Sequence, residues 1–293
     1  MPALPRRVRL LPGLAVVLAL AACGAPAPTV DPPAASSAPA APTATPLTGG
    51  ATIAAPSTPP TSPPPSTAAP IARSPQTQRT RVVVLDPGHN GGNAAAPAAI
   101  NRQVPDGRSG TKACNTTGTE TDAGYPEHAF TFDVAQRVAQ RLAGQGVRVV
   151  LTRGDDTGVG PCVDERGRAG EKADADAVVS IHADGAGAGD RGFHVAYSDP
   201  PLNDVQRGPA RTLAADLRDG LVAAGFTRST YIGRDGLSHR RDLAGLNLAT
   251  RPTALIECAN MRNPAEAQTV SSAAGRDHYA AAITDGILRF LDG

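Results

Sequence analysis

Residues 82–92 read Val-Val-Val-Leu-Asp-Pro-Gly-His-Asn-Gly-Gly, and this stretch decides the fold class. Four apolar residues in a row are typical of a short strand that is buried on both faces of a mainly parallel sheet. The run ends in a polar, glycine-rich segment that contains His89. We therefore expect a strand followed by a loop at the carboxyl edge of a sheet.

The residues that follow alternate between helix-like and strand-like segments. Pro126 is expected in the first turn of a helix that ends near Gly144. The apolar face of this helix is predicted to hold Phe130, Val134, Val138 and Leu142. Further strands are predicted at 147–151, 177–181, 192–197 and 253–257, and further helices at 210–224 and 275–291. The pattern predicts an α/β fold: a single domain with a mostly parallel twisted sheet flanked by helices, and a site at the carboxyl ends of the strands.

The chain before this domain has a different composition. Between Gly24 and Thr80 lie 15 of the 28 prolines, and the only charged residues there are Asp31, Arg73 and Arg79. Such a segment cannot bury enough apolar surface to offset the entropy lost on ordering. We expect residues 23–80 to form a disordered Pro/Ala/Ser/Thr-rich tether and residues 81–293 to form the folded domain, a size sufficient for one core.

The first 22 residues have the pattern of an export signal. Three arginines precede position 10, and residues 14–20 form an apolar run too short to span a bilayer stably. The tetrapeptide Leu20-Ala21-Ala22-Cys23 resembles the lipobox of bacterial lipoproteins, which implies cleavage before Cys23 and lipidation of that residue. The alternative is an ordinary signal peptide whose cleavage region happens to contain a cysteine. In either case we expect export, and with lipidation an anchor on the outer face of the cell membrane, facing the cell wall or periplasm.

The charge of the folded part excludes one class of partner. Without the arginines of the export segment and the net single positive charge of residues 24–80, the total of +1 becomes −3 for residues 81–293. No basic field remains that would attract nucleic acid. We expect no nucleic-acid partner, and we expect the domain to be a monomer.

Three cysteines remain besides Cys23, and an exported domain meets oxidising conditions. Cys114 and Cys162 lie in polar, glycine-rich segments, whereas Cys258 follows an apolar run. The favoured arrangement is a disulfide between Cys114 and Cys162, with Cys258 as a buried thiol. Because no Cys-x-x-Cys spacing exists, nothing supports a thiolate zinc cluster or a thioredoxin-type site.

Four ionisable residues are predicted to meet at the carboxyl edge of the sheet. His89 follows the first strand, while His182 and Glu257 each end a later one. Glu127 joins them from the first turn of the helix after Pro126. Catalytic zinc usually takes three histidine or carboxylate ligands and keeps one position open, which suits His89, Glu127 and His182. Glu257 would then be the base that binds no metal.

Each of these residues also has an ordinary structural interpretation. A single histidine at a strand end is more often a hydrogen-bonded structural residue than a ligand. Glu127 would by itself complement the positive N-terminus of its helix. Glu257 is harder to explain in this way, because a carboxylate beside an apolar run needs a cation, a network of donors or a function.

The ordered set of motifs is more specific than any one of them. The motifs are residues 83–92, the helix with Glu127, Ser180-Ile181-His182-Ala183-Asp184, and Leu255-Ile256-Glu257-Cys258-Ala259-Asn260. From about Val82 onward the sequence resembles the zinc-dependent N-acetylmuramoyl-L-alanine amidases of the third amidase family, especially mycobacterial-type cell-wall amidases. The resemblance implies Zn²⁺ on His89, Glu127 and His182, catalysis by Glu257, and cleavage of the amide between N-acetylmuramic acid and L-alanine in peptidoglycan.

Two features depart from the family pattern. Many members carry Gly-Phe after the catalytic glutamate, where this chain has Cys258 and Ala259. The loop at 93–124 is also too long for an ordinary connection. It is expected either to shape a substrate groove or partly cover the metal, or to be only a stapled surface loop. Two other functions stay open at this point: a non-catalytic wall-binding lipoprotein, and a zinc carboxypeptidase that cuts within the stem peptide.

Overall fold

The computed structural model describes residues 79–293. The predicted export signal, Cys23 and the tether up to residue 78 lie outside the described residues. The strands are β1 (Val82–Pro87), β2 (Gln103–Pro105), β3 (Thr111–Ala113), β4 (Arg148–Leu151), β5 (Ala177–Asp184), β6 (His194–Ser198), β7 (Leu237–Arg240) and β8 (Thr253–Asn260). The helices are η1 (Asn93–Ala95), α1 (Pro97–Ile100), α2 (Glu127–Ala143), α3 (Val163–Gly167), α4 (Ala169–Lys172), α5 (Asp204–Arg207), α6 (Pro209–Ala223), α7 (Ala244–Asn247), α8 (Pro264–Ser271) and α9 (Ala273–Asp292).

Six strands form one sheet in the order β4-β1-β5-β8-β6-β7. β1 pairs in parallel with β4 and β5, and β5 pairs in parallel with β8. β6 runs antiparallel to β8 and parallel to β7, so these two strands point the other way. The α/β fold with a mostly parallel sheet is therefore confirmed.

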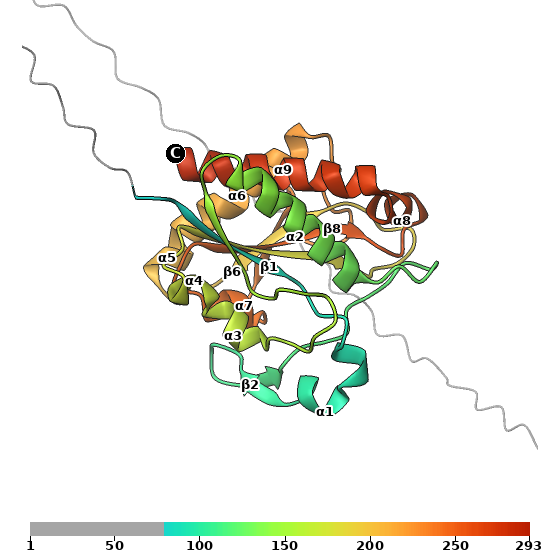
Figure 1. Ribbon diagram of the computed structural model, residues 1–293, viewed down its shortest axis with the longest axis horizontal. Coiled ribbons are helices and arrows are strands. Elements are labelled where there is room, and N and C mark those ends of the chain that lie inside the picture. Colours follow the sequence, from blue (N-terminus) through green and yellow to red (C-terminus); the bar gives the residue numbers. More distant parts are fainter. Residues whose placement is uncertain (1–78) are drawn as a thin grey trace, which may run out of the picture. The chain divides into compact units, whose positions relative to one another are not determined.

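Helices cover both faces of this sheet (Figure 1). The long helices α2, α6 and α9 pack on one face, and the short helices α3, α4 and α7 lie on the other. Residues alternate between the two layers along β1: Val83 and Leu85 join the main core under the long helices, and Val82 and Val84 face the short ones. The four residues predicted for the apolar face of α2 are all fully buried in the main core.

The structure differs from the predicted elements at several boundaries. β5 and β8 extend beyond the predicted segments to Asp184 and Asn260, which pair with each other after a register shift. His182 and Glu257 therefore lie inside their strands instead of at the ends. Pro126 is the extended residue just before α2 and does not belong to the first turn.

Other elements were not predicted at all. The 93–124 segment holds η1, α1 and the two-stranded hairpin β2–β3, and β7 and α8 lie in stretches for which the sequence predicts neither helix nor strand. Most of these elements are only three to five residues long, too short to give a periodic sequence pattern. None of the helices between residues 79 and 293 is long and apolar enough to cross a membrane.

Candidate active site

His89 lies in the loop after β1, where its backbone has a φ of +58°. Its Nδ1 is 3.1 Å from the Thr116 carbonyl oxygen, which can only accept a hydrogen bond. The Thr116 hydroxyl lies 3.2 Å from the same nitrogen, so Nδ1 faces Thr116 and Nε2 faces Glu127. This Nε2 lies 3.1 Å from Oε2 of Glu127.

Glu127 is the first residue of α2 and is almost completely buried. Its Oε1 accepts a hydrogen bond from the Ala183 backbone N–H at 3.1 Å, and its Oε2 accepts one from Thr119 N–H at 3.0 Å. Oε1 is also 3.0 Å from Nδ1 of His182. Both carboxylate oxygens are thus fixed by the backbone and face one imidazole each.

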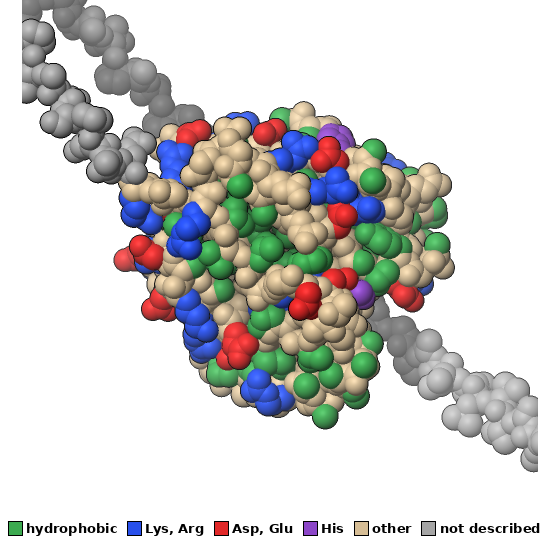
Figure 2. Space-filling model, viewed as in Figure 1, with side chains coloured by type: hydrophobic (Ala, Val, Ile, Leu, Met, Phe, Trp, Pro, Cys, Tyr) green, Lys and Arg blue, Asp and Glu red, His purple; other side chains and the backbone are tan. Residues whose placement is uncertain are grey.

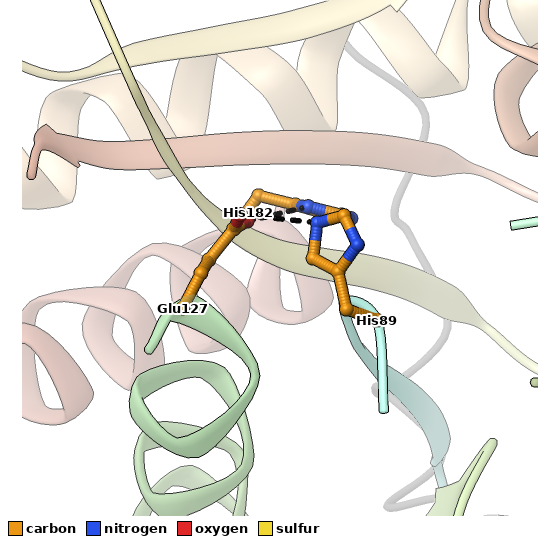
Figure 3. Close-up of side chains that lie close together, drawn as sticks. All are labelled: His89, Glu127 and His182. Atoms are coloured by element: carbon orange, nitrogen blue, oxygen red, sulfur yellow. Dashed lines mark hydrogen bonds and ion pairs between the residues drawn. The ribbon is translucent and has the colours of Figure 1, made fainter. Parts of the chain in front are cut away.

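The three side chains come from the loop after β1, from α2 and from β5, and they point toward one another (Figure 3). One ligand atom from each of His89, Glu127 and His182 lies within 4.8 Å of the others. The two imidazole rings stand nearly perpendicular, with their centroids 4.9 Å apart. The sequence-predicted ligand set is therefore brought together by the fold.

Two glycines allow this close approach. A Cβ on Gly88 would lie 2.3 Å from Cε1 of His182, and a Cβ on Gly118 would lie 2.8 Å from Oε2 of Glu127. Gly118 also has a φ of +82°, a conformation that side chains rarely adopt. Any side chain at either position would displace one of the three residues.

The electrostatics of the three residues favour a bound cation. Burial would raise the pKa of Glu127, but the charges and hydrogen bonds of His89 and His182 outweigh it and lower the pKa. Burial lowers the pKa of His89, yet the charge and hydrogen bond of Glu127 raise it above its usual value. A buried carboxylate with an imidazole nitrogen at each oxygen is a donor set that fits Zn²⁺, whose ligands include histidine nitrogen and carboxylate oxygen.

Glu257 lies beside this group, as register partner of His182 across β5 and β8. Its Oε2 is buried and has no hydrogen-bond partner among the described residues. Burial, followed by the charges of Glu127 and Asp184, raises the pKa of Glu257 well above its usual value. On the far side, burial lowers the pKa of its neighbour His194 to about 4, so that ring is uncharged at neutral pH.

A cavity of about 500 Å³ opens onto these four residues. Its walls include Thr116, Thr119 and Lys112 from the 93–124 segment, and its apolar part is lined by residues of α7 and by Leu255. A second hollow of about 460 Å³ shares Gly118 and Thr119 with the first. The 93–124 segment therefore shapes the wall of the cavity, which is one of the two roles expected for it.

A disulfide fixes this segment to the loop after β4. It joins Cys114 and Cys162, the pairing favoured by the sequence, and Cys258 is a buried free thiol. The Val163 backbone N–H also donates to the Cys114 carbonyl at 2.7 Å. The bridge therefore holds the wall of the cavity next to α3.

In the described part of the chain, Asp86 forms hydrogen bonds with side chains other than the ligand imidazoles. It accepts hydrogen bonds from Thr152, Arg166 and Ser180. Burial would raise its pKa, but the charge of Arg166 and these hydrogen bonds lower it.

Sequence reasoning also missed Arg166 itself and Arg153, because arginines in polar loops ordinarily lie in solvent. Figure 2 shows Lys, Arg, Asp and Glu side chains scattered over this face of the molecule.

Comparison with known proteins gives consistent matches over the folded part of the chain. A family model described as N-acetylmuramoyl-L-alanine amidase matches residues 83–289. The chain is 51% identical over 210 residues to the N-acetylmuramoyl-L-alanine amidase Rv3717 of Mycobacterium tuberculosis, a match that covers 72% of this chain and 86% of that protein.

Solved structures agree. The crystal structure of the N-acetylmuramyl-L-alanine amidase Ami1 from Mycobacterium smegmatis matches with a TM-score of 0.71 and 52% identity, over 72% of this chain and 97% of that one. The apo form of Ami1 from Mycobacterium abscessus matches with a TM-score of 0.70 and 53% identity, over 72% of this chain and 98% of that one.

Proposed function

The chain belongs to the N-acetylmuramoyl-L-alanine amidase family and is a peptidoglycan hydrolase, and we propose that His89, Glu127 and His182 bind its zinc while Glu257 acts as the base. The reaction is hydrolysis of the amide that joins N-acetylmuramic acid to L-alanine. One observation carries the assignment of the residues: ligand atoms of His89, Glu127 and His182 lie within 4.8 Å of one another, next to a carboxylate with an unpaired oxygen.

The proposed metal would act as the Lewis acid of the reaction. Zn²⁺ bound by these residues would lower the pKa of water in the site toward neutrality and polarise the scissile carbonyl. The protein's own contribution is to hold the ligands in place. Glu127 is fixed by backbone N–H groups at both oxygens, and Thr116 orients the ring of His89 through Nδ1.

The proposed proton transfers depend on Glu257. Its unpaired Oε2 accepts a proton from the attacking water as the oxygen bonds to the muramoyl carbonyl carbon. The same proton then goes to the alanine nitrogen as the C–N bond breaks. The products are a free lactyl carboxylic acid and a free amino group on L-alanine, so no covalent enzyme intermediate is needed.

The shape of the cavity suits a substrate fragment that extends across the site. The two hollows meet at Gly118 and Thr119, next to His89 and Glu127. We propose that the scissile amide lies in the larger hollow and that the substrate continues over the 118–119 backbone into the smaller one.

We also propose that the mature chain begins at a lipidated Cys23. The supporting feature is the lipobox-like tetrapeptide after the apolar run, together with the tether at 23–80. This anchor would hold the domain at the outer face of the membrane, within reach of the wall.

We propose a monomer, because the large apolar side chains exposed on the described domain are Val159 and Leu202, too few for an apolar interface.

Digestion of purified peptidoglycan tests the reaction. New N-terminal alanine together with free muramic lactyl groups is the expected result. Shortened stem peptides would instead indicate a carboxypeptidase, and unchanged peptidoglycan with bound protein would indicate a wall-binding module. Analysis of soluble products by mass spectrometry separates the three outcomes.

A further inference from the structure

The backbone that carries His89 has three successive carbonyl groups that accept hydrogen bonds from side chains. The chain leaves β1 at Pro87, passes through Gly88 and reaches His89 at a φ of +58°. All three residues are buried. Buried carbonyl oxygens need hydrogen-bond donors, because an unpaired one costs about 1–3 kcal/mol. In this protein two arginine side chains supply donors to all three.

Arg166 binds this loop from α3. Its guanidinium is almost completely buried, and it has one hydrogen-bond acceptor for each of its five N–H groups. The contacts are Asp86 Oδ1 (2.7 Å) and the carbonyl oxygens of Pro87 (2.7 Å), His89 (2.8 Å), Gly160 (3.1 Å) and Pro161 (3.0 Å). One side chain thus joins both ends of the His89 loop to the loop that follows β4.

Arg153 binds the same loop from the segment just after β4 and connects it to α2. Its guanidinium contacts the carbonyl oxygens of Pro87 (3.0 Å), Gly88 (3.2 Å) and His128 (2.8 Å), together with Asp155 O, Asp156 Oδ1 and Thr131 Oγ1. The Thr131 hydroxyl in turn donates to the Gly88 carbonyl at 2.9 Å. Because His128 follows Glu127, this arginine links the backbones of two proposed ligands.

We propose that Arg153 and Arg166 are positioning residues that hold the backbones of His89 and Glu127 in the geometry required for metal binding. This inference rests on the proposed zinc site. Lysine cannot replace either residue. The three nitrogens of a guanidinium donate to carbonyl groups on different sides of its plane edge, whereas the three donors of lysine lie on a single nitrogen and cannot reach all of them. The two arginines act through the ligands: neither belongs to the set of His89, Glu127 and His182, although Arg166 also lines the cavity.

Each of the two arginines is paired with a carboxylate. Arg166 pairs with Asp86 and Arg153 pairs with Asp156. Buried ion pairs of this kind are weak contributors to stability, since desolvation cancels much of the attraction. The free energy spent on burying these two arginines is therefore better explained by the hydrogen bonds that they donate to the carbonyl groups of residues 87–89 than by the ion pairs alone.

Zinc affinity measured beside folding stability tests the inference. The variants are Arg153→Lys and Arg166→Lys in the full chain, with Arg276→Lys as the matched control. Arg276 is also largely buried and donates to backbone carbonyls, those of Val270 and Ser271, but it does not touch the ligand loop. Metal-free proteins are titrated with Zn²⁺ against a chromophoric chelator, and their melting temperatures are recorded with and without Zn²⁺.

The expected result is zinc binding about 10- to 100-fold weaker in both test variants, the range found when groups that orient metal ligands are lost. The control should bind zinc within about 2-fold of the wild type even though its metal-free melting temperature also falls. Thr131→Val removes one donor to Gly88 without changing charge, and a loss of about 3-fold or more is expected there. If the arginine variants do not fold, the zinc affinity of Thr131→Val tests the inference in their place.

If Arg153→Lys and Arg166→Lys bind zinc as tightly as the control, this inference is wrong, while the proposed zinc ligands are unaffected. If the arginine variants do not fold, unchanged zinc affinity in Thr131→Val does the same. A wild-type chain that binds no zinc overturns the proposed metal centre and this inference together.

Discussion

His182 and Glu257 are register partners on the neighbouring parallel strands β5 and β8. Paired residues of adjacent strands project from the same face of a sheet, so the proposed base lies directly beside a proposed ligand. The two residues nevertheless differ in their contacts: His182 faces Glu127, whereas Oε2 of Glu257 has no partner in the described part of the chain. This difference is the physical basis for assigning them separate roles.

Replacing Glu257 separates metal binding from catalysis. Glu257→Gln should keep nearly full zinc occupancy while hydrolysis falls by roughly 100-fold or more, the scale expected for the loss of a general base. The amide has almost the same shape but cannot take the proton of water. Zinc content and turnover are measured on the same preparation. A zinc-free variant would make Glu257 a ligand, and an active one would place the base elsewhere.

Replacing either histidine of the metal centre should remove metal and activity together. His89→Ala and His182→Ala each leave two protein ligands, which hold zinc poorly. His239→Ala is the control, because that side chain is 61% exposed and pairs with Asp199 away from the three ligands. Metal analysis after dialysis checks the result. Full zinc occupancy in either test variant would contradict the ligand assignment.

The disulfide should contribute measurably to stability. Cys114 and Cys162 are 48 residues apart, and closing a loop of that length stabilises by roughly 4 kcal/mol in the chain-entropy model. The double variant Cys114→Ser/Cys162→Ser should lose about that much free energy of unfolding in urea. Peptide mapping without reduction identifies the linked cysteines, and a bridge between Cys114 and Cys258 would refute the assignment.

Lipidation at Cys23 predicts membrane attachment that depends on one thiol. Cys23→Ala should appear in the soluble fraction or accumulate with its export segment still attached. Fractionation and mass determination of the N-terminus in the native host check both results. Normal processing together with unchanged membrane retention would rule out the anchor.

The buried pair of Asp86 and Arg166 predicts a specific dependence of stability on pH. The pKa of Asp86 is lowered in the folded state, so its contribution is present above about pH 4 and is lost as the pH falls through the folded value. In the metal-free protein, Asp86→Asn should cost roughly 3 kcal/mol at pH 7, because it leaves Arg166 without a counter-charge.

Urea unfolding between pH 2.5 and pH 7 measures this contribution. The difference between wild type and Asp86→Asn should shrink below about pH 4. Asp204→Asn serves as the control, since that carboxylate is fully exposed and should change stability little at any pH. A difference that stayed constant across the pH range would mean that the ion pair is not its source.

The sequence by itself determined the fold class and the identity of the proposed site residues. The apolar run at 82–85 indicates burial on both faces, which is typical of a strand in a parallel sheet covered by helices on both sides. Ends of parallel strands meet at one edge, so residues after such runs could be expected to converge although they are far apart in the chain. The two loop cysteines were likewise identifiable, because the third follows an apolar strand.

The direction and length of the later strands were decided by tertiary structure. β6 pairs antiparallel to β8, and β8 extends to Asn260 to pair with Asp184. Local sequence gives a strand no direction, because its hydrogen-bond partners come from distant segments. The short hairpin in the 93–124 segment is held by contacts with the rest of the domain that no periodic pattern records.

The tertiary structure alone also decided how the ligands are held. Arg153 and Arg166 lie in polar segments that suggest solvent exposure, yet both are buried. Their burial follows from the carbonyl groups of Pro87, Gly88 and His89, which leave the sheet and need donors inside the protein. Such a requirement arises only when the loop after β1, the start of α2 and the loop after β4 come together, so no single stretch of sequence contains it.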